Sequence, residues 1–479
     1  MARGWFNSIT LKTHSKIWAR RSFKVAVYGV LGLSIITVSG QLLLPLLERY
    51  QPTIENQVSQ AMKTRVRFSQ FKAHWVGLEP DITIDDLKVY HPQQADTVIL
   101  EILHIHIELA LLQSILQWDW RLDAQASGVQ LNVVQQETGA WAVKELLALG
   151  KSRLEVRERA LTWILKQAEW QFSDVNLAIH PYQQPVLLLT EAQLTNRNRA
   201  QRHDFRLSAR LNQQPIKLFA DIKSAQNPLI FSSWQGRVYA KVTPQAWLPW
   251  LKTQQLANDL TLSDLTVGGE FWLKLKNGMA EQVIAQLDAP SILATYQKHN
   301  YRVQQLAGLL TWQQQKPELW QVVAEQLQGF INQRALPLST LSVEKKSTLL
   351  TIAGGKINLE PLALLAQEAP TPTVLKNWLI QAKPSGHISN VAVQLTINND
   401  STAKIHQVSA VFDHLSAVAT NDYSGFKNIS GWLIHAEQEG SAAINIDNGE
   451  LDLRQVYRVP TAIENLKAIL QWQQIGDDW

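Results

Sequence analysis

Residues 98–109 read VILEILHIHIEL, and apolar and polar side chains alternate along this stretch. One side of an extended chain would carry the apolar residues Leu103, Ile105, Ile107 and Leu109. The other side would carry two histidines and Glu108. A period of two is typical of a β-strand with one buried face, because successive side chains of a strand point to opposite sides. The stretch therefore predicts a half-buried strand.

The same alternation continues along the chain beyond this strand. Around the turn at Ser127-Gly128, the alternating apolar residues are Trp118, Trp120, Leu122, Val129, Leu131 and Val133. Further strands are predicted at 82–90, 170–179, 205–211, 216–222, 236–242, 269–276, 348–353, 391–397 and 441–454. Turn residues such as Asn277-Gly278 separate many of them, which is typical of antiparallel hairpins.

One-sided antiparallel sheets must bury their apolar side against something. Two sheets packed as a sandwich and one long sheet curled into an open trough give the same alternation. The alternation pattern alone therefore does not distinguish a sandwich from an open trough.

Helical signals are sparse. Residues 141–168 are rich in helix formers, and Thr243-Pro244 and Glu360-Pro361 resemble helix starts, with Pro in the first turn. A further helix is predicted at 460–473, and the stretch QEAPTPT, 367–373, is the best internal hinge.

The N-terminal part of the chain is typical of a membrane anchor. Residues 25–47, VAVYGVLGLSIITVSGQLLLPLL, carry no charge, and residues 1–24 contain six basic residues and no acidic one. A helix of this length reaches roughly 35 Å, enough to cross the ~30 Å hydrocarbon layer. The basic tail predicts a cytoplasmic N-terminus. A cleaved signal peptide is the alternative, but no small-x-small cleavage site ends the run.

Composition excludes several functional classes. The chain carries +4 overall, and outside the tail 39 basic residues face 41 acidic ones. Nucleic-acid binding, which needs a basic surface on the folded part, is therefore not expected. The absence of cysteine excludes thiol nucleophiles, iron–sulfur clusters and cysteine-based zinc sites.

The chain offers few candidates for chemistry. His104 and His106 share one strand face, but only Glu108 follows as a further ligand, so a solvated face explains them better than a metal site. The chain has no G-x-S-x-G, P-loop or H-E-x-x-H motif. We therefore expect no catalytic residue, no metal, no cofactor and no enzymatic activity.

Two segments resemble a known family. Residues 51–92, QPTIENQVSQAMKTRVRFSQFKAHWVGLEPDITIDDLKVYHP, resemble the juxtamembrane helix and first hairpin of AsmA-like proteins of the YhdP type. Residues 423–460, YSGFKNISGWLIHAEQEGSAAINIDNGELDLRQVYRVP, resemble that family's recurring G-x-x-N-I/L-S-G unit with its following strands. Family members are much longer, so the resemblance implies an N-terminal portion of a longer architecture or a product split from it.

The resemblance implies a mainly β fold with a few helices, in which a transmembrane helix precedes an elongated antiparallel sheet curled into a groove of repeated hairpins. It divides the chain into a cytoplasmic tail (1–24), an anchor in the bacterial inner membrane (25–47) and a periplasmic β-groove domain (48–479). The groove would conduct or hold phospholipid between the inner and outer membranes. Its lipid-groove candidates are Leu103, Ile105, Ile107, Leu109, Trp118, Trp120, Leu122, Val129, Leu131 and Val133.

The expected partners are phospholipid acyl chains, the inner membrane and other envelope proteins. Two alternatives stay open. An assembly factor would bind outer-membrane protein strands at an exposed sheet edge. A structural scaffold would have a closed, dry sandwich as its β-domain.

Overall fold

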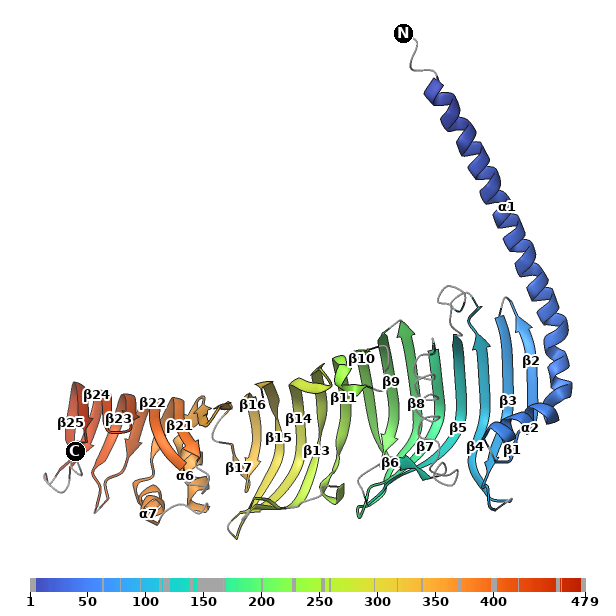
Figure 1. Ribbon diagram of the computed structural model, residues 1–479. Helices are drawn as coiled ribbons and strands as arrows, with labels where there is room; N and C mark the ends of the chain where they lie inside the picture. The colour runs from blue at the N-terminus through green and yellow to red at the C-terminus, as the bar shows by residue number, and fades with distance from the viewer. Residues whose placement is uncertain are drawn as a thin grey trace. The chain divides into compact units, whose positions relative to one another are not determined.

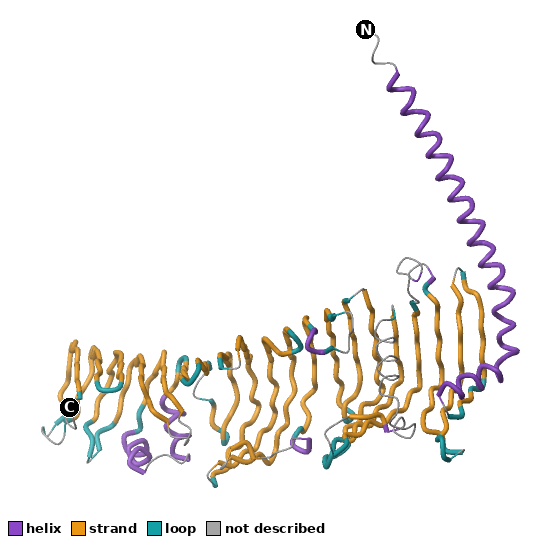
Figure 2. The backbone as a smooth tube through the Cα atoms, in the orientation of Figure 1, coloured by secondary structure: helices purple, strands orange, loops and turns teal. Residues whose placement is uncertain are grey.

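The structure is a computed structural model, drawn in Figure 1 as a ribbon and in Figure 2 by secondary structure. It describes residues 6–474 apart from a set of short gaps and one longer gap. These gaps are 63, 78, 95, 112–113, 115–120, 138–140, 145–166, 168, 200, 226–229, 251–254, 258–259, 297, 317, 337–338, 369–372, 398–402, 421, 454–456 and 458. Strands make up 67% of the structure. The chain divides into two compact units, residues 1–182 with 186–213 and residues 183–185 with 214–479.

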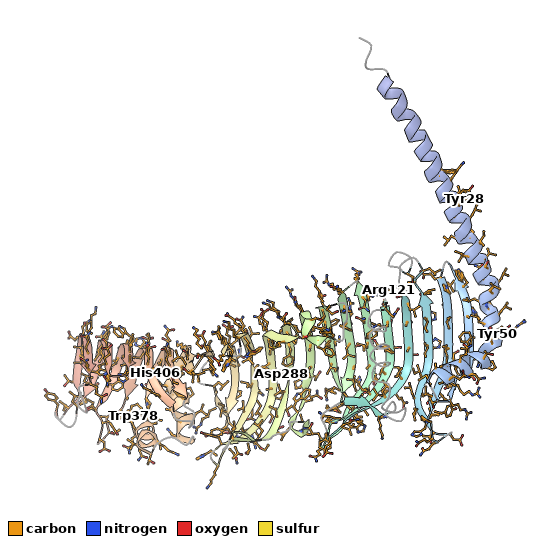
Figure 3. The ribbon with its side chains drawn as sticks, in the orientation of Figure 1. Tyr28, Tyr50, Arg121, Asp288, Trp378 and His406 are labelled. Atoms are coloured by element: carbon orange, nitrogen blue, oxygen red, sulfur yellow. The ribbon has the colours of Figure 1, made fainter. Side chains whose placement is uncertain are left out.

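The N-terminal helix α1, Phe6–Leu43, contains residues 25–43 of the expected anchor, 25–47, and is long and apolar enough to cross a membrane. It ends where Pro45 follows, because Pro45 has no backbone N–H to donate to the Gln41 carbonyl, and the 3₁₀ turn η1, Leu44–Tyr50, comes next. Tyr28 and Tyr50, both labelled in Figure 3, are 69% and 59% exposed.

Helix α2, Gln51–Met62, connects the anchor to the first unit. Ile54 of α2 packs against an apolar cluster of Phe68, Phe71 and Ala73. Glu55 is buried, forms an ion pair with Arg67 and accepts a hydrogen bond from the Phe68 backbone N–H. These contacts hold α2 against the start of the sheet.

The first unit contains one sheet in which strands follow one another mostly in chain order. Its strands are β1 (Val66–Arg67), β2 (Gln70–Val76), β3 (Glu79–Tyr90), β4 (Val98–Leu109), β5 (Leu122–Gln135), β6 (Trp141–Val143), β7 (Glu169–His180), β8 (Leu187–Arg199) and β9 (Arg202–Leu211). The pairings are antiparallel except between β5 and β7, which run parallel.

The second unit repeats antiparallel hairpins. Its strands are β10 (Gln214–Lys223), β11 (Gln235–Ala246), β12 (Gln255–Ala257), β13 (Leu260–Lys276), β14 (Met279–Tyr296), β15 (His299–Lys316), β16 (Leu319–Ile331), β17 (Arg334–Ala335), β18 (Leu341–Lys346), β19 (Leu349–Gly354), β20 (Ile357–Asn358), β21 (Ser385–Ile397), β22 (Ala403–Ala417), β23 (Gly425–Ala436), β24 (Glu439–Asp452) and β25 (Thr461–Gln473). Short 3₁₀ turns η2, Phe231–Ser233, and η3, Leu248–Trp250, flank β11. Helices α6, Leu359–Glu368, and α7, Thr373–Ala382, lie between β20 and β21.

These observations confirm the expected fold class: a mainly β chain with an N-terminal apolar helix and an open antiparallel sheet. The predicted helix after Glu360-Pro361 is also confirmed as α6. Most of the helix expected at 141–168 lies outside the described residues.

Two helix predictions were wrong. Of residues 460–473, Thr461–Gln473 form β25, because β24 offers them twelve cross-strand partners, Glu439 to Leu451, and this pairing overrides local helix propensity. Thr243-Pro244 lies inside β11 at an irregularity between Val242 and Gln245. A bulge tolerates a proline because no ladder hydrogen bond is required there.

A line of backbone kinks crosses the sheet of the first unit. Asp86, Gly128 and Asp174 have φ of 55°, 68° and 49°. The strand register places these three residues and Leu103 next to one another across the sheet. Asp86 of β3 lies beside Leu103 of β4, which lies beside Gly128 of β5, and Gly128 lies beside Asp174 of β7. Such left-handed residues interrupt the regular pleat, as bulges do.

The kink keeps one face of the sheet apolar. Ile82 and Ile84 precede Asp86, and Leu87 follows it, yet all three pack against the cluster of Phe68, Phe71 and Ala73. Strict alternation would put Leu87 on the opposite face from Ile84. On this face of β3, the apolar residues therefore have even numbers before the kink and odd numbers after it.

Candidate functional site

The first unit presents continuous apolar rows across its strands. Residues directly opposite one another share a face, and one row runs from β2 to β9 without a polar member. It consists of Phe71, Ile84, Ile105, Ala126, Phe172, Leu194 and Leu207. Phe71, next to α2, is 8% exposed, and the other six are half-buried.

The structure brings most of the sequence candidates together on or beside these rows. Ile105 belongs to the row just described, and Ile107 lies opposite Ile82 and Ala124. Leu109 lies opposite Leu122. The candidates beyond Gly128 are aligned with apolar residues of β7, as Val129 with Val175, Leu131 with Leu177 and Val133 with Ile179.

The remaining candidates fall elsewhere. Leu103 lies on the kink line and is 53% exposed, and its side chain fills the space beside Gly128. Trp118 and Trp120 lie outside the described residues. Phe71, Phe172 and Leu194 were missed as candidates, because only the cross-strand register places them in line with Ile105.

The second unit carries a longer apolar row. Ten consecutively paired strands, β10, β11, β13, β14, β15, β16, β18, β19, β21 and β22, each contribute one apolar residue to it. The members are Ala220, Val238, Leu273, Val283, Trp312, Val322, Val343, Ile352, Val393 and Val408. We call this set the apolar row. Nine steps of ~4.8 Å between strands give it a length of roughly 43 Å.

The opposite face of the same strands carries a polar row, and two residues along from it Phe219, Tyr239 and Trp272 form an aromatic group on that same face. On each of the ten strands, a residue next in sequence to the member of the apolar row is polar. These polar residues also lie directly opposite one another from strand to strand. They are Asp221, Arg237, Lys274, Gln282, Gln313, Gln321, Glu344, Thr351, Gln394 and Gln407, which we call the polar row.

Ion pairs are typical of the polar face. Glu270 accepts hydrogen bonds from Lys241 Nζ at 2.8 Å and from Tyr239 Oη at 3.1 Å. These two donors lower the pKa of Glu270, the lysine most strongly. Lys274 Nζ lies 2.7 Å from Glu281. These charged groups suit contact with water.

The apolar row is incompletely buried. Ala220 is buried, whereas the other nine members are half-buried. Among the described residues, the fully buried apolar positions are mainly alanines, such as Ala285 and Ala289 on β14. A second sheet packed on this face would bury the large side chains as well. The described part of the chain contributes no such layer, so the large apolar side chains form an accessible surface.

The polar face of the first unit holds a row of carboxylates. Asp81, Glu108, Asp123 and Glu169 are directly opposite one another on β3, β4, β5 and β7. Glu169 forms an ion pair with Arg197. Burial raises the pKa of Asp123, and the neighbouring Glu169 and Glu108 raise it further.

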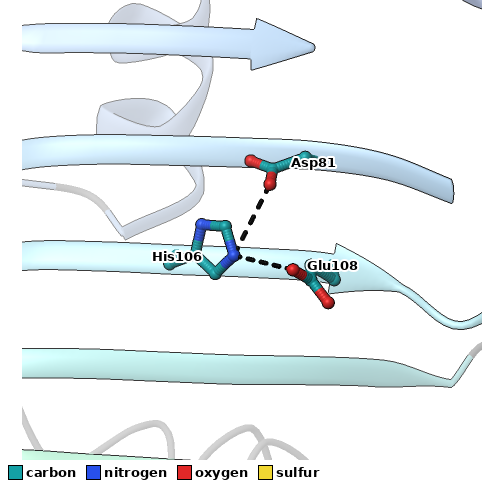
Figure 4. A group of neighbouring side chains, drawn as sticks. All are labelled: Asp81, His106 and Glu108. Atoms are coloured by element: carbon teal, nitrogen blue, oxygen red, sulfur yellow. Dashed lines mark hydrogen bonds and ion pairs between the residues drawn. The ribbon is translucent and has the colours of Figure 1, made fainter. Parts of the chain in front are cut away.

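Two histidines of β4 point to this polar face. His106 Nε2 lies 3.0 Å from Glu108 Oε1 and 3.5 Å from Asp81 Oδ2, as Figure 4 shows. His104, two residues earlier, has Asp85 Oδ1 at 2.5 Å from its Nδ1. Asp81 was not among the sequence candidates, because it is 25 residues from His106 and only strand pairing brings it near.

Comparison with known protein families shows to which family the chain belongs. The family model of the YhdP protein matches residues 8–479, nearly the whole chain. The chain belongs to the YhdP family. This confirms the resemblance drawn from residues 51–92 and 423–460. No curated protein and no solved structure matches the chain significantly. Membership of the YhdP family accords with an α1 that is long and apolar enough to span a membrane, and it suggests a role in the cell envelope.

Proposed function

We propose that this YhdP-family protein is anchored in the bacterial inner membrane by α1 and guides phospholipid acyl chains along the apolar faces of its periplasmic sheet units. In this proposal residues 1–24 lie in the cytoplasm, 25–47 span the membrane and 48–479 form the periplasmic part. The observation that carries the proposal is the apolar row, which continues across ten strands with a polar row on the opposite face.

The physical role of such a surface is to remove a solvation barrier. Burying one CH₂ group contributes ~0.8 kcal/mol, so exposing a 16-carbon chain to water costs on the order of 12 kcal/mol. An apolar surface lowers this cost at every step of the path, and it needs no covalent chemistry. The apolar row, at roughly 43 Å, is longer than a ~30 Å hydrocarbon layer.

The two faces also separate the parts of a phospholipid. Acyl chains would lie against residues such as Val283 and Trp312, and the charged head group would remain in water. This explains why the apolar row contains no charged residue that would recognise a particular head group. The same surface would accept phospholipids with different head groups.

Photo-crosslinking in living cells tests this proposal with a matched pair of positions. A photoreactive amino acid at Val283 is expected to capture phospholipid, because Val283 belongs to the apolar row. The same amino acid at Gln282, the neighbouring member of the polar row, is expected to capture at least tenfold less. Mass spectrometry of the adducts measures both. Equal capture at the two positions, or none at Val283, would contradict the proposal.

The proposed topology has its own test. Alkaline phosphatase folds actively only outside the cytoplasm, so a fusion after Gln213, between the two units, is expected to be active. Green fluorescent protein fused at the same position is expected to be dark. The reverse pattern would place the sheet in the cytoplasm and exclude both the anchor orientation and transport through the periplasm.

A further inference from the structure

Three potential metal ligands converge on the polar face of the first unit. Asp81, His106 and Glu108 each offer one donor atom, and these atoms all lie within 4.8 Å of one another. Within the described part of the chain, this is the one place where three such groups meet. In tetrahedral zinc sites, bonds of ~2.0 Å place neighbouring donor atoms roughly 3.3 Å apart. The measured separations from His106 Nε2, 3.0 and 3.5 Å, bracket that spacing.

The hydrogen bonding of His106 suits a metal ligand. Its second ring nitrogen, Nδ1, lies 3.4 Å from the Thr83 hydroxyl. A hydrogen bond from Nδ1–H to this oxygen would leave the lone pair of Nε2 directed at the two carboxylates. Histidines that bind metals are usually oriented by such an outer partner, which fixes the tautomer. The side chains of Asp81 and His106 are only 18% and 23% exposed, so their geometry is held by the sheet.

The local charge also suits a cation. Asp81 and Glu108 face each other directly on β3 and β4, and like charges in this arrangement destabilise a sheet. Asp123 lies on the other side of Glu108, and its Oδ1 is buried with no hydrogen-bond partner among the described residues. A divalent cation would neutralise the Asp81–Glu108 pair and reduce the repulsion from Asp123.

We propose that Asp81, His106 and Glu108 bind one divalent transition-metal ion of the Zn²⁺ class, with water completing the coordination. The imidazole favours Zn²⁺ over Mg²⁺ and Ca²⁺, which prefer oxygen ligands. The ion would join β3 to β4 on the water-facing side of the sheet. This site is separate from the apolar rows, and it does not rest on the proposed lipid function.

The test uses the full chain in detergent, freed of metal with a chelator and titrated with Zn²⁺ by calorimetry. One ion per chain is expected. His106→Ala is expected to weaken binding by more than the 10–100-fold typical of losing an outer partner, and Thr83→Val by about tenfold. Co²⁺ in place of Zn²⁺ is expected to give the visible absorption of a tetrahedral site.

His104→Ala is the matched control, because His104 lies on the same face of β4 but has a single carboxylate, Asp85, beside it. It is expected to bind Zn²⁺ as the unmodified chain does. Circular dichroism of the metal-free variants checks that each has folded. Absence of stoichiometric binding, or equal weakening by His104→Ala and His106→Ala in folded protein, would overturn the proposal.

Discussion

Replacing Val283 with Asp is expected to block lipid movement along the second unit. Val283 is in the middle of the apolar row, between Leu273 and Trp312. A carboxylate at this position remains hydrated. About three CH₂ groups of a passing acyl chain would then lose their contact with the apolar surface, at a cost of roughly 2.4 kcal/mol. Lipid captured by a photoreactive residue on the far side of the substitution, at Val343, should fall by more than tenfold.

Gln282→Asp is the matched control for this substitution. It introduces the same charge one residue away, on the polar face, where Lys274 is the opposite residue of β13. Lipid capture at Val343 should be unchanged in this variant, and both variants should have the circular dichroism spectrum of the unmodified chain. If Gln282→Asp reduced capture as strongly as Val283→Asp, the apolar row would not be the path.

Replacing Gly128 with Ala is expected to destabilise the first unit by about 3 kcal/mol. Two effects add at this position. Gly128 has φ of 68°, where a Cβ atom is strained, and the new atom would lie 2.7 Å from Leu103 Cβ. For a unit of this size, the loss corresponds to a melting temperature lower by roughly 6–12 °C. Thermal unfolding followed by circular dichroism measures it.

Gly77→Ala separates the two effects. Gly77 has a similar φ of 60°, but a Cβ atom added there would meet nothing within 4 Å. It should cost about 1 kcal/mol, the backbone strain alone. The double substitution Gly128→Ala with Leu103→Ala should recover part of the loss caused by crowding. Equal destabilisation by Gly77→Ala and Gly128→Ala would show that contact with Leu103 contributes nothing.

The period-two pattern predicted the strands well because it is a local property of each strand. VILEILHIHIEL lies in β4, and the other predicted strands correspond to β3, β7, β9, β10, β11, β13, β19, β21 and β24. Helix propensity was less reliable. Residues 461–473 contain Ala, Leu, Glu and Lys, which favour helices, but the adjacent β24 supplied the backbone partners of a strand.

The candidate surface was only partly predictable. Leu122, Val129, Leu131 and Val133 could be named as apolar positions, but a single bulge can reverse the facing of a whole strand. Their common face depends on the left-handed Gly128, whose conformation no alternation pattern reveals. The function of these residues as lipid contacts stays a prediction.

By itself, the sequence determined the long apolar N-terminal helix, the mainly β character, the alternation of apolar and polar residues within each regular strand segment, and the YhdP family. These properties are encoded in residues close together along the chain. Only the tertiary structure decided which residues stand opposite one another. It aligned Val283 with Trp312 in a row across ten strands and brought Asp81 to His106. Register joins residues far apart in the chain through backbone hydrogen bonds, and these bonds are the same for every side chain, so composition and periodicity do not specify them.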